Sequence, residues 1–105
     1  MTEKRKPAYD LTAFKAAFVD VDNLNVTGTA VRGAAALGFG RAAIVATIQT
    51  MQRSHFYKSM TSYGGHRIWQ DVYHVPSEAG TLYIKFTADA ATGFVLLSFK
   101  EKDDE

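Results

Sequence analysis

The chain has 105 residues, a formal net charge of +1 and 47% hydrophobic residues. This length fits one domain with a modest core, and the composition argues against a disordered or fibrous protein. Cysteine is absent, which excludes disulfides and thiolate metal sites and suits a reducing compartment, so we expect a cytoplasmic protein.

Neither a secretory signal nor a membrane span is expected. The basic N-terminus is not followed by an apolar run, and the most apolar stretch, 34–48, is interrupted by Arg41 and glycines. Residues 53–100 hold five Lys or Arg against three Asp or Glu. This moderately basic region is compatible with binding a phosphate backbone. The basic residues at 4–6 are expected to form a solvated arm.

Three helices are predicted in the first half of the chain. Their expected starts are Asp10 for a helix to about Val19, Thr27 or Thr29 for one through Leu37, and Gly40 for the third. The apolar positions at helical spacing are Leu11, Phe14, Phe18, Ala30, Val31, Ala34, Leu37, Ile44, Ile48 and Met51. Gly33 weakens the second helix, and Gly38 is a plausible stop.

After Arg53 the pattern changes to the period of two that strands show. The predicted strands are about His55–Ser62, Arg67–Val75, Thr81–Ala88 and Phe94–Glu101. The connections, Gly64-Gly65, Pro76–Gly80 and Asp89–Gly93, are short enough for antiparallel neighbours. Helices followed by strands predict an α+β domain, with helices on one face of a mainly antiparallel sheet of four or more strands.

Alternation along each strand predicts which side chains share a face. The apolar sets expected to face the helices are Trp69 and Tyr73; Leu82, Ile84 and Phe86; and Val95, Leu97 and Phe99. The opposite sets are Gln70, Val72 and His74; Tyr83, Lys85 and Thr87; and Phe94, Leu96, Ser98 and Lys100. Lys58 shares its parity with Phe56 and Met60, so the first strand needs a bulge or twist to settle its direction.

A sheet face carrying Lys58, Gln70, Tyr83 and Lys100 is suited to RNA. Ammonium groups attract phosphate, and exposed aromatic rings stack on unpaired bases. Cleavage needs no metal if the ribose 2′-hydroxyl attacks the adjacent phosphorus. Such a reaction requires a proton acceptor, a proton donor for the 5′-oxygen, and positive charge to stabilise the phosphorane.

At residues 56–73 the chain closely resembles the MqsR family of bacterial toxins. The matching residues are Phe56, Tyr57, Lys58, Ser59, Met60, Thr61, Tyr63, His66, Ile68, Trp69, Gln70, Asp71, Val72 and Tyr73. The resemblance continues over Ser98–Lys102 and is thinner over residues 79–87. It is faint through the first 50 residues, apart from Glu3-Lys4-Arg5 and Pro7 at the start. It implies a RelE-like fold and a type II toxin that inhibits translation and growth. The implied activity is cleavage of single-stranded mRNA at GC-containing sites, independent of the ribosome, of metals and of cofactors.

The resemblance also implies the site and the partner. The implied catalytic residues are Lys58, Gln70, Tyr83 and Lys100. We expect Lys58 and Lys100 to stabilise charge, Tyr83 to transfer a proton and Gln70 to position the RNA. The residues expected to contact RNA are Tyr57, Met60, Tyr73, His74 and Lys85. The implied partner is an antitoxin with a zinc-binding N-terminal domain and a helix-turn-helix C-terminal domain.

Several alternatives stay open at this point. For both Tyr57 and Tyr73, core packing and base stacking remain alternatives. For Tyr83 the alternative to a catalytic role is a half-buried cross-strand partner, and the two roles are compatible. His74 stands where the family is expected to have arginine, and the 89–93 loop looks longer than expected. The three histidines are too far apart in sequence to predict a metal site. The alternative function is a non-catalytic module that binds RNA or a protein through the same sheet face.

Overall fold

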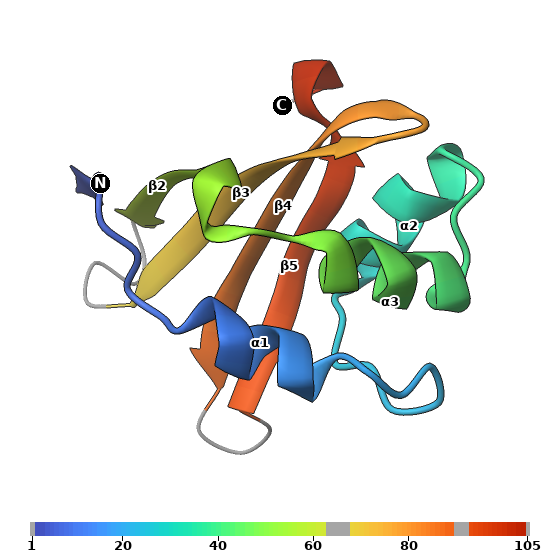
Figure 1. Cartoon of the computed structure of the whole chain (residues 1–105), viewed down its shortest axis with the longest axis horizontal. Helices are drawn as coiled ribbons and strands as arrows, with labels where there is room; N and C mark the ends of the chain where they lie inside the picture. Colours follow the sequence, from blue (N-terminus) through green and yellow to red (C-terminus); the bar gives the residue numbers. More distant parts are fainter. Residues whose placement is uncertain (1, 63–67, 90–92, 105) are drawn as a thin grey trace.

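The computed structural model describes residues 2–62, 68–89 and 93–104, and in this part of the chain helices cover one face of an antiparallel sheet (Figure 1). The helices are α1 (Leu11–Ala17), α2 (Gly28–Ala36) and α3 (Arg41–Thr50), with short 3₁₀ turns η1 (Arg53–His55) and η2 (Lys102–Asp104). The strands are β1 (Glu3–Lys4), β2 (Phe56–Thr61), β3 (Trp69–Ser77), β4 (Gly80–Asp89) and β5 (Gly93–Glu101). The predicted α+β fold is therefore confirmed. The predicted Gly64-Gly65 turn and most of the 89–93 loop lie outside the described residues.

The sheet is a meander in the order β1-β2-β3-β4-β5, and each strand pairs with the next one antiparallel. The prediction of a solvated arm at residues 4–6 is wrong for its first part, because β1 pairs with the outer edge of β2. Glu3 lies opposite Met60 and Lys4 opposite Ser59. The Lys4 ammonium also sits 4.1 Å from the Trp69 ring centroid. A two-residue strand shows no alternation, so its pairing has no sequence signal.

The helices begin where the capping residues predict. The Asp10 carboxylate accepts a hydrogen bond from the Thr12 N–H at 2.9 Å, and α1 ends at Ala17, two residues earlier than expected. The Thr27 hydroxyl accepts from the Ala30 N–H at 3.1 Å, which decides between the two threonines considered for α2. Gly40 precedes α3 without a side-chain cap.

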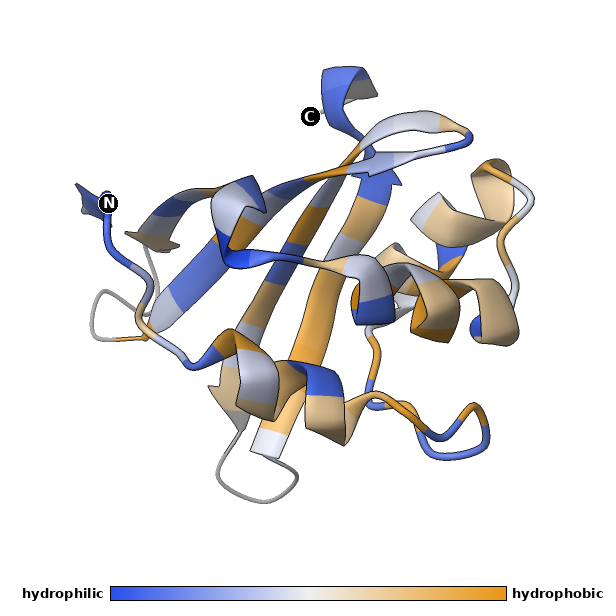
Figure 2. Cartoon of the chain, in the orientation of Figure 1, coloured by the Kyte–Doolittle hydropathy of each residue, from blue (hydrophilic) through white to orange (hydrophobic). Residues whose placement is uncertain are grey.

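The core lies between the three helices and the inner sheet face. Its fully buried large side chains are Tyr73, Phe14, Phe18, Phe86, Phe99, Ile48, Met51, Leu82, Ile84, Leu96 and Val75. Phe14 of α1 stacks on Phe86 of β4 with ring centroids 3.7 Å apart, which ties α1 to the middle of the sheet. Figure 2 shows the resulting contrast between the apolar β5 strand with its adjoining helices and the polar N-terminal segment.

A β-bulge in each of two strands decides which residues face the helices. In β2 the register shifts between Phe56 and Lys58, so Phe56 packs on the core Tyr73 while Lys58 points to the opposite face. This bulge resolves the parity conflict seen in the sequence. In β5 the register shifts between the Lys85–Ser98 and Phe86–Leu96 pairs, leaving Leu97 as the extra residue.

The β5 bulge corrects the predicted grouping of that strand. Leu96 and Phe99 are both buried in the core, although strict alternation placed them on opposite faces. The prediction that Val95 and Leu97 face the helices together with Phe99 is therefore wrong, because the residues that precede the bulge have the opposite orientation. The predictions for Phe99, Ser98 and Lys100, which follow the bulge, agree with the structure. A bulge adds one residue to one strand and reverses the alternation beyond it.

The β3–β4 turn is tighter than predicted. Residues 76–80 were expected to form a loop, yet Pro76 pairs with Thr81 and Ser77 with Gly80 inside the two strands. Pro76 fits a strand here because β2 pairs with β3 only as far as Tyr73, so the other side of β3 is open. Gly80, at φ 94°, adopts the left-handed conformation that the turn requires.

Within the described residues, no single helix is long and apolar enough to cross a membrane. In the described part of the chain, α2 and α3 taken together reach the required length and composition, but the pair is bent by 91°.

Asp71 fixes the chain segment between β1 and α1. Its side chain is fully buried on the helix side of β3 and accepts hydrogen bonds from the N–H groups of Ala8 and Tyr9, both at 3.0 Å. The Tyr9 hydroxyl in turn donates to the Trp69 carbonyl at 2.8 Å. These contacts hold the N-terminal segment, including β1, against the sheet.

We expect the Asp71→Asn variant to lose about 2 kcal/mol of unfolding free energy, because a charged acceptor of buried N–H groups becomes a neutral amide. For a chain of this size the melting temperature should fall by roughly 10 °C. Thermal unfolding followed by circular dichroism measures the change. An unchanged melting temperature would show that Asp71 does not anchor the N-terminal segment.

Candidate nucleic-acid interface

The sheet face turned away from the helices, called here the open face, gathers most of the polar side chains that the sequence singles out. Register and alternation place on it Lys58, Met60, Gln70, Val72, His74, Tyr83, Lys85, Ser98 and Lys100. All four of the predicted catalytic residues are in this set. They come from β2, β3, β4 and β5, so the whole width of the sheet contributes to one surface.

One cross-strand row joins His74, Tyr83 and Lys100 in direct register. The Lys100 ammonium lies 5.2 Å from the Tyr83 ring centroid, and the His74 ring lies 6.1 Å from the same ring. Tyr83 is only 7% exposed, so its ring is a packed cross-strand partner. A cation over a phenol ring is an attractive arrangement that fixes both groups. The row thus holds a phenol and an ammonium side by side.

A second row carries Lys58, Val72, Lys85 and Ser98 from β2 to β5. Val72 is fully buried, and the two lysines flank it. The pKa of Lys85 is lowered, first by burial and then by repulsion from the charges of Lys100 and Lys58. The ammonium groups of Lys58, Lys85 and Lys100 are therefore close enough to repel one another. An anion bound among them would relieve this repulsion, as expected of a phosphate site.

Aromatic stacking continues the open face towards the outer edge of the sheet. Tyr57 stacks on His74 with ring centroids 4.2 Å apart and planes 22° from parallel. The guanidinium carbon of Arg5 lies 5.2 Å from the centroid of the Tyr57 ring. The same guanidinium donates a hydrogen bond to the Tyr57 carbonyl at 3.1 Å. Tyr57 remains 38% exposed. A partly exposed ring beside cations is the type of surface on which an unpaired base stacks.

Met60 and Gln70 form a cross-strand pair between β2 and β3. Both are half-buried, and they lie one row away from Lys58 and Val72. The carboxamide of Gln70 carries both donors and acceptors, so this part of the face can orient a ligand without adding charge.

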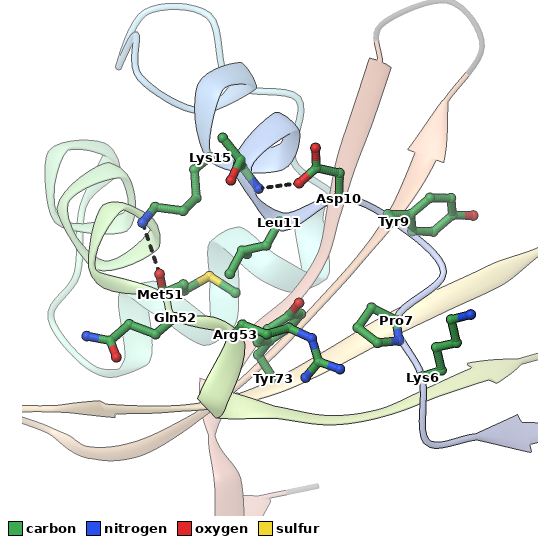
Figure 3. Close-up of a pocket in the computed structure, with 11 residues that line it drawn as sticks. Lys6, Pro7, Tyr9, Asp10, Leu11, Lys15, Met51, Gln52, Arg53 and Tyr73 are labelled. Carbon is green, nitrogen blue, oxygen red and sulfur yellow. Dashed lines mark hydrogen bonds between the residues drawn. The ribbon is translucent and has the colours of Figure 1, made fainter.

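Tyr73 is the predicted RNA-contacting residue that the open face does not contain. Its side chain is fully buried among core residues on the helix side, so the packing alternative fits and base stacking on this ring does not. Burial and the nearby Asp71 carboxylate raise the pKa of Tyr73 to about 12, which keeps its hydroxyl neutral. The ring also lies at the base of a hollow of about 610 Å³ between the N-terminal segment, α1 and η1, where Lys6, Lys15 and Arg53 surround the opening (Figure 3).

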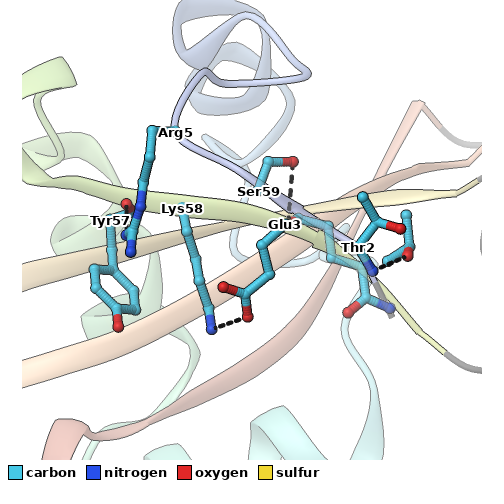
Figure 4. A network of polar contacts seen from close by, with 8 residues as sticks. Thr2, Glu3, Arg5, Tyr57, Lys58 and Ser59 are labelled. Atoms are coloured by element: carbon cyan, nitrogen blue, oxygen red, sulfur yellow. Dashed lines mark hydrogen bonds and ion pairs between the residues drawn. The ribbon is translucent and has the colours of Figure 1, made fainter.

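Two charged residues on the open face, Glu3 and Arg5, were not predicted as site residues. Glu3 of β1 forms an ion pair with Lys58, whose Nζ atom lies 2.6 Å from the carboxylate, and Arg5 lies beside Tyr57. Figure 4 shows Glu3, Lys58, Tyr57 and Arg5 on the same side of β2, with Ser59 on the other (Figure 4). The family resemblance at Glu3-Lys4-Arg5 was the sequence feature that pointed to these residues. The local pattern of apolar and polar residues did not predict that this segment joins the sheet.

Two comparisons with known proteins show the family of this chain. Residues 6–101 match the family model described as motility quorum-sensing regulator, toxin of MqsA. The chain is also 37% identical over 100 residues to the mRNA interferase toxin MqsR of Escherichia coli (strain K12), covering 95% of this chain and 99% of that protein. Because both matches span nearly the whole sequence, the chain belongs to the MqsR toxin family.

Proposed function

We propose that this protein is the toxin of a toxin–antitoxin pair and acts as an endoribonuclease on mRNA. The family and the mRNA interferase name of the Escherichia coli relative support this activity. The observation that carries the proposal is the convergence of Lys58, Tyr83 and Lys100 on one open face. These groups supply positive charge and a phenolic proton, which are what cleavage of a ribose–phosphate link requires.

The proposed reaction is an attack of the ribose 2′-oxygen on the adjacent phosphorus. The O2′–P bond forms, the P–O5′ bond breaks, and the products are a 2′,3′-cyclic phosphate and a 5′-hydroxyl. Lys58 and Lys100 stabilise the negative charge on the phosphorane, and Gln70 positions the RNA. Tyr83 gives its proton to the departing 5′-oxygen, since a tyrosine hydroxyl is protonated at neutral pH. His74 and Lys85 are the neighbouring groups whose neutral forms can accept the 2′-hydroxyl proton.

Finer features of the proposal concern the substrate and the partner. Exposed Tyr57 beside His74 suits an unpaired base, which supports single-stranded mRNA as the substrate. Cutting at GC-containing sites without the ribosome is proposed from the family resemblance. We further propose that cleavage needs no metal ion, because Lys58 and Lys100 on the open face can supply the positive charge that stabilises the phosphorane. The proposed partner is an MqsA-type antitoxin with zinc-binding and helix-turn-helix domains.

The test is to incubate the purified protein with a long transcript in EDTA and to map the cut ends. We expect cleavage near GC-containing sites, with Lys58→Ala and Lys100→Ala each at least tenfold slower because a charge that stabilises the phosphorane is lost. Lys6→Ala is the matched control, because Lys6 lines the hollow on the helix side rather than the open face. RNA that is bound but stays intact at high protein concentration would instead support the non-catalytic module.

A further inference from the structure

The ion pair between Glu3 and Lys58 is unusual in its position. Glu3 pairs with Met60, which places its carboxylate on the open face, whereas Asp71 of β3 faces the helices and Glu101 of β5 lies opposite the core residue Leu82. Its charged neighbours there are Lys58 of the proposed site and Arg5. A carboxylate beside a phosphate-binding surface repels the substrate, and its presence therefore calls for a physical reason.

Stability does not supply that reason. The Glu3 side chain is 43% exposed, and exposed ion pairs contribute little to unfolding free energy. β1 is held independently of the pair, since the Thr61 N–H donates to the Thr2 carbonyl at 2.9 Å and the Thr2 N–H donates to the Thr61 hydroxyl at 3.0 Å. The effect of Glu3 falls instead on Lys58, whose side chain is only 18% exposed and whose ammonium it contacts.

The contact leaves Lys58 with the capacity to bind a phosphate. An ammonium group has three N–H donors, and one of them is used by Glu3. The hydrogen bond from Lys58, together with the charges of Lys58 and Arg5, lowers the pKa of Glu3. The carboxylate therefore stays ionised at neutral pH, where it is a poor proton acceptor and a good anchor for a cation.

We propose that Glu3 is a positioning residue, which holds the Lys58 ammonium over the open face so that its remaining donors meet the phosphate of the RNA. This inference rests on the proposed function. A lysine side chain is long and flexible, and fixing it before the substrate arrives avoids ordering it in the transition state. In this arrangement β1 contributes a residue to the site in addition to forming the edge of the sheet.

The test is Glu3→Gln, which keeps the side-chain shape and removes the charge. We expect kcat for RNA cleavage to fall about tenfold, because Lys58 is no longer held in its productive position. The Kd for a 2′-O-methyl, non-cleavable RNA should stay the same or decrease, because a negative charge has left the binding surface. The melting temperature should not change. Glu78→Gln, an exposed residue of the β3–β4 turn, is the matched control and should leave both constants unaltered.

Each other outcome has a definite meaning. An unchanged or higher kcat would overturn the inference, because Glu3 would then only compete with the RNA for Lys58. A lower kcat with weaker RNA binding or a lower melting temperature would also overturn it, because Glu3 would then support the fold. If the wild-type protein binds the RNA without cutting it, the proposed function fails, and the role of Glu3 fails with it.

Discussion

Replacing Tyr83 with phenylalanine is expected to lower kcat for RNA cleavage about 100-fold, the typical size of a general acid's contribution. The substitution removes one hydroxyl and leaves the ring, which packs between His74 and Lys100 with 7% of the residue exposed. Because the ring keeps those contacts, the fold and the Kd for RNA should not change. Single-turnover cleavage of a short labelled RNA measures the chemical step directly.

The matched control is Tyr73→Phe, the same chemical change one strand away on the opposite face. The Tyr73 hydroxyl is buried and has no hydrogen-bond partner within the described structure, so its removal should leave stability unchanged or raise it by up to about 1 kcal/mol. Cleavage by this variant should match the wild type. Equal losses in both variants, or full activity of Tyr83→Phe, would remove Tyr83 from the proton-transfer role.

Much of the fold follows from local patterns in the sequence. The caps at Asp10 and Thr27 and the helical spacing of apolar residues place α1, α2 and α3 within a few residues. Four of the strands, β2 to β5, are predicted by the alternation of apolar and polar residues, because each strand buries one of its faces. What local patterns miss is pairing between distant segments. β1 has two residues and gains its structure from β2, more than fifty positions away.

The candidate site was predictable to the extent that alternation holds. Gln70, Tyr83 and Lys100 share the open face because β3, β4 and the end of β5 alternate without interruption. Lys58 reaches the same face only through the bulge at Tyr57, and a bulge depends on the partner strand as much as on its own sequence. Glu3 was missed for the same reason as β1, because its role exists only once the N-terminal segment pairs with the sheet.

The close approach of α2 to β5 gives the second prediction. By helix propensity alone, Gly33→Ala should stabilise α2 by up to about 1 kcal/mol. A Cβ atom at this position, however, would lie 2.3 Å from the Phe99 carbonyl oxygen and 3.4 Å from the Lys100 Cβ. The oxygen belongs to the backbone of a paired strand and cannot rotate away. The helix must therefore move off β5, which disturbs the buried contacts of Ala30 and Ala34.

We expect Gly33→Ala to lose about 2–3 kcal/mol of unfolding free energy, the cost typical of an overpacked interior. Urea unfolding measures this change. The control is Gly28→Ala in the same helix, where the nearest atom to a new Cβ is the end of the flexible Arg32 side chain at 3.0 Å, so stability should hold. Because Phe99 precedes Lys100, a displaced β5 should also slow RNA cleavage in the Gly33 variant at temperatures where it remains folded. A Gly33→Ala protein as stable as the Gly28→Ala protein would mean that α2 and β5 are not in this close contact.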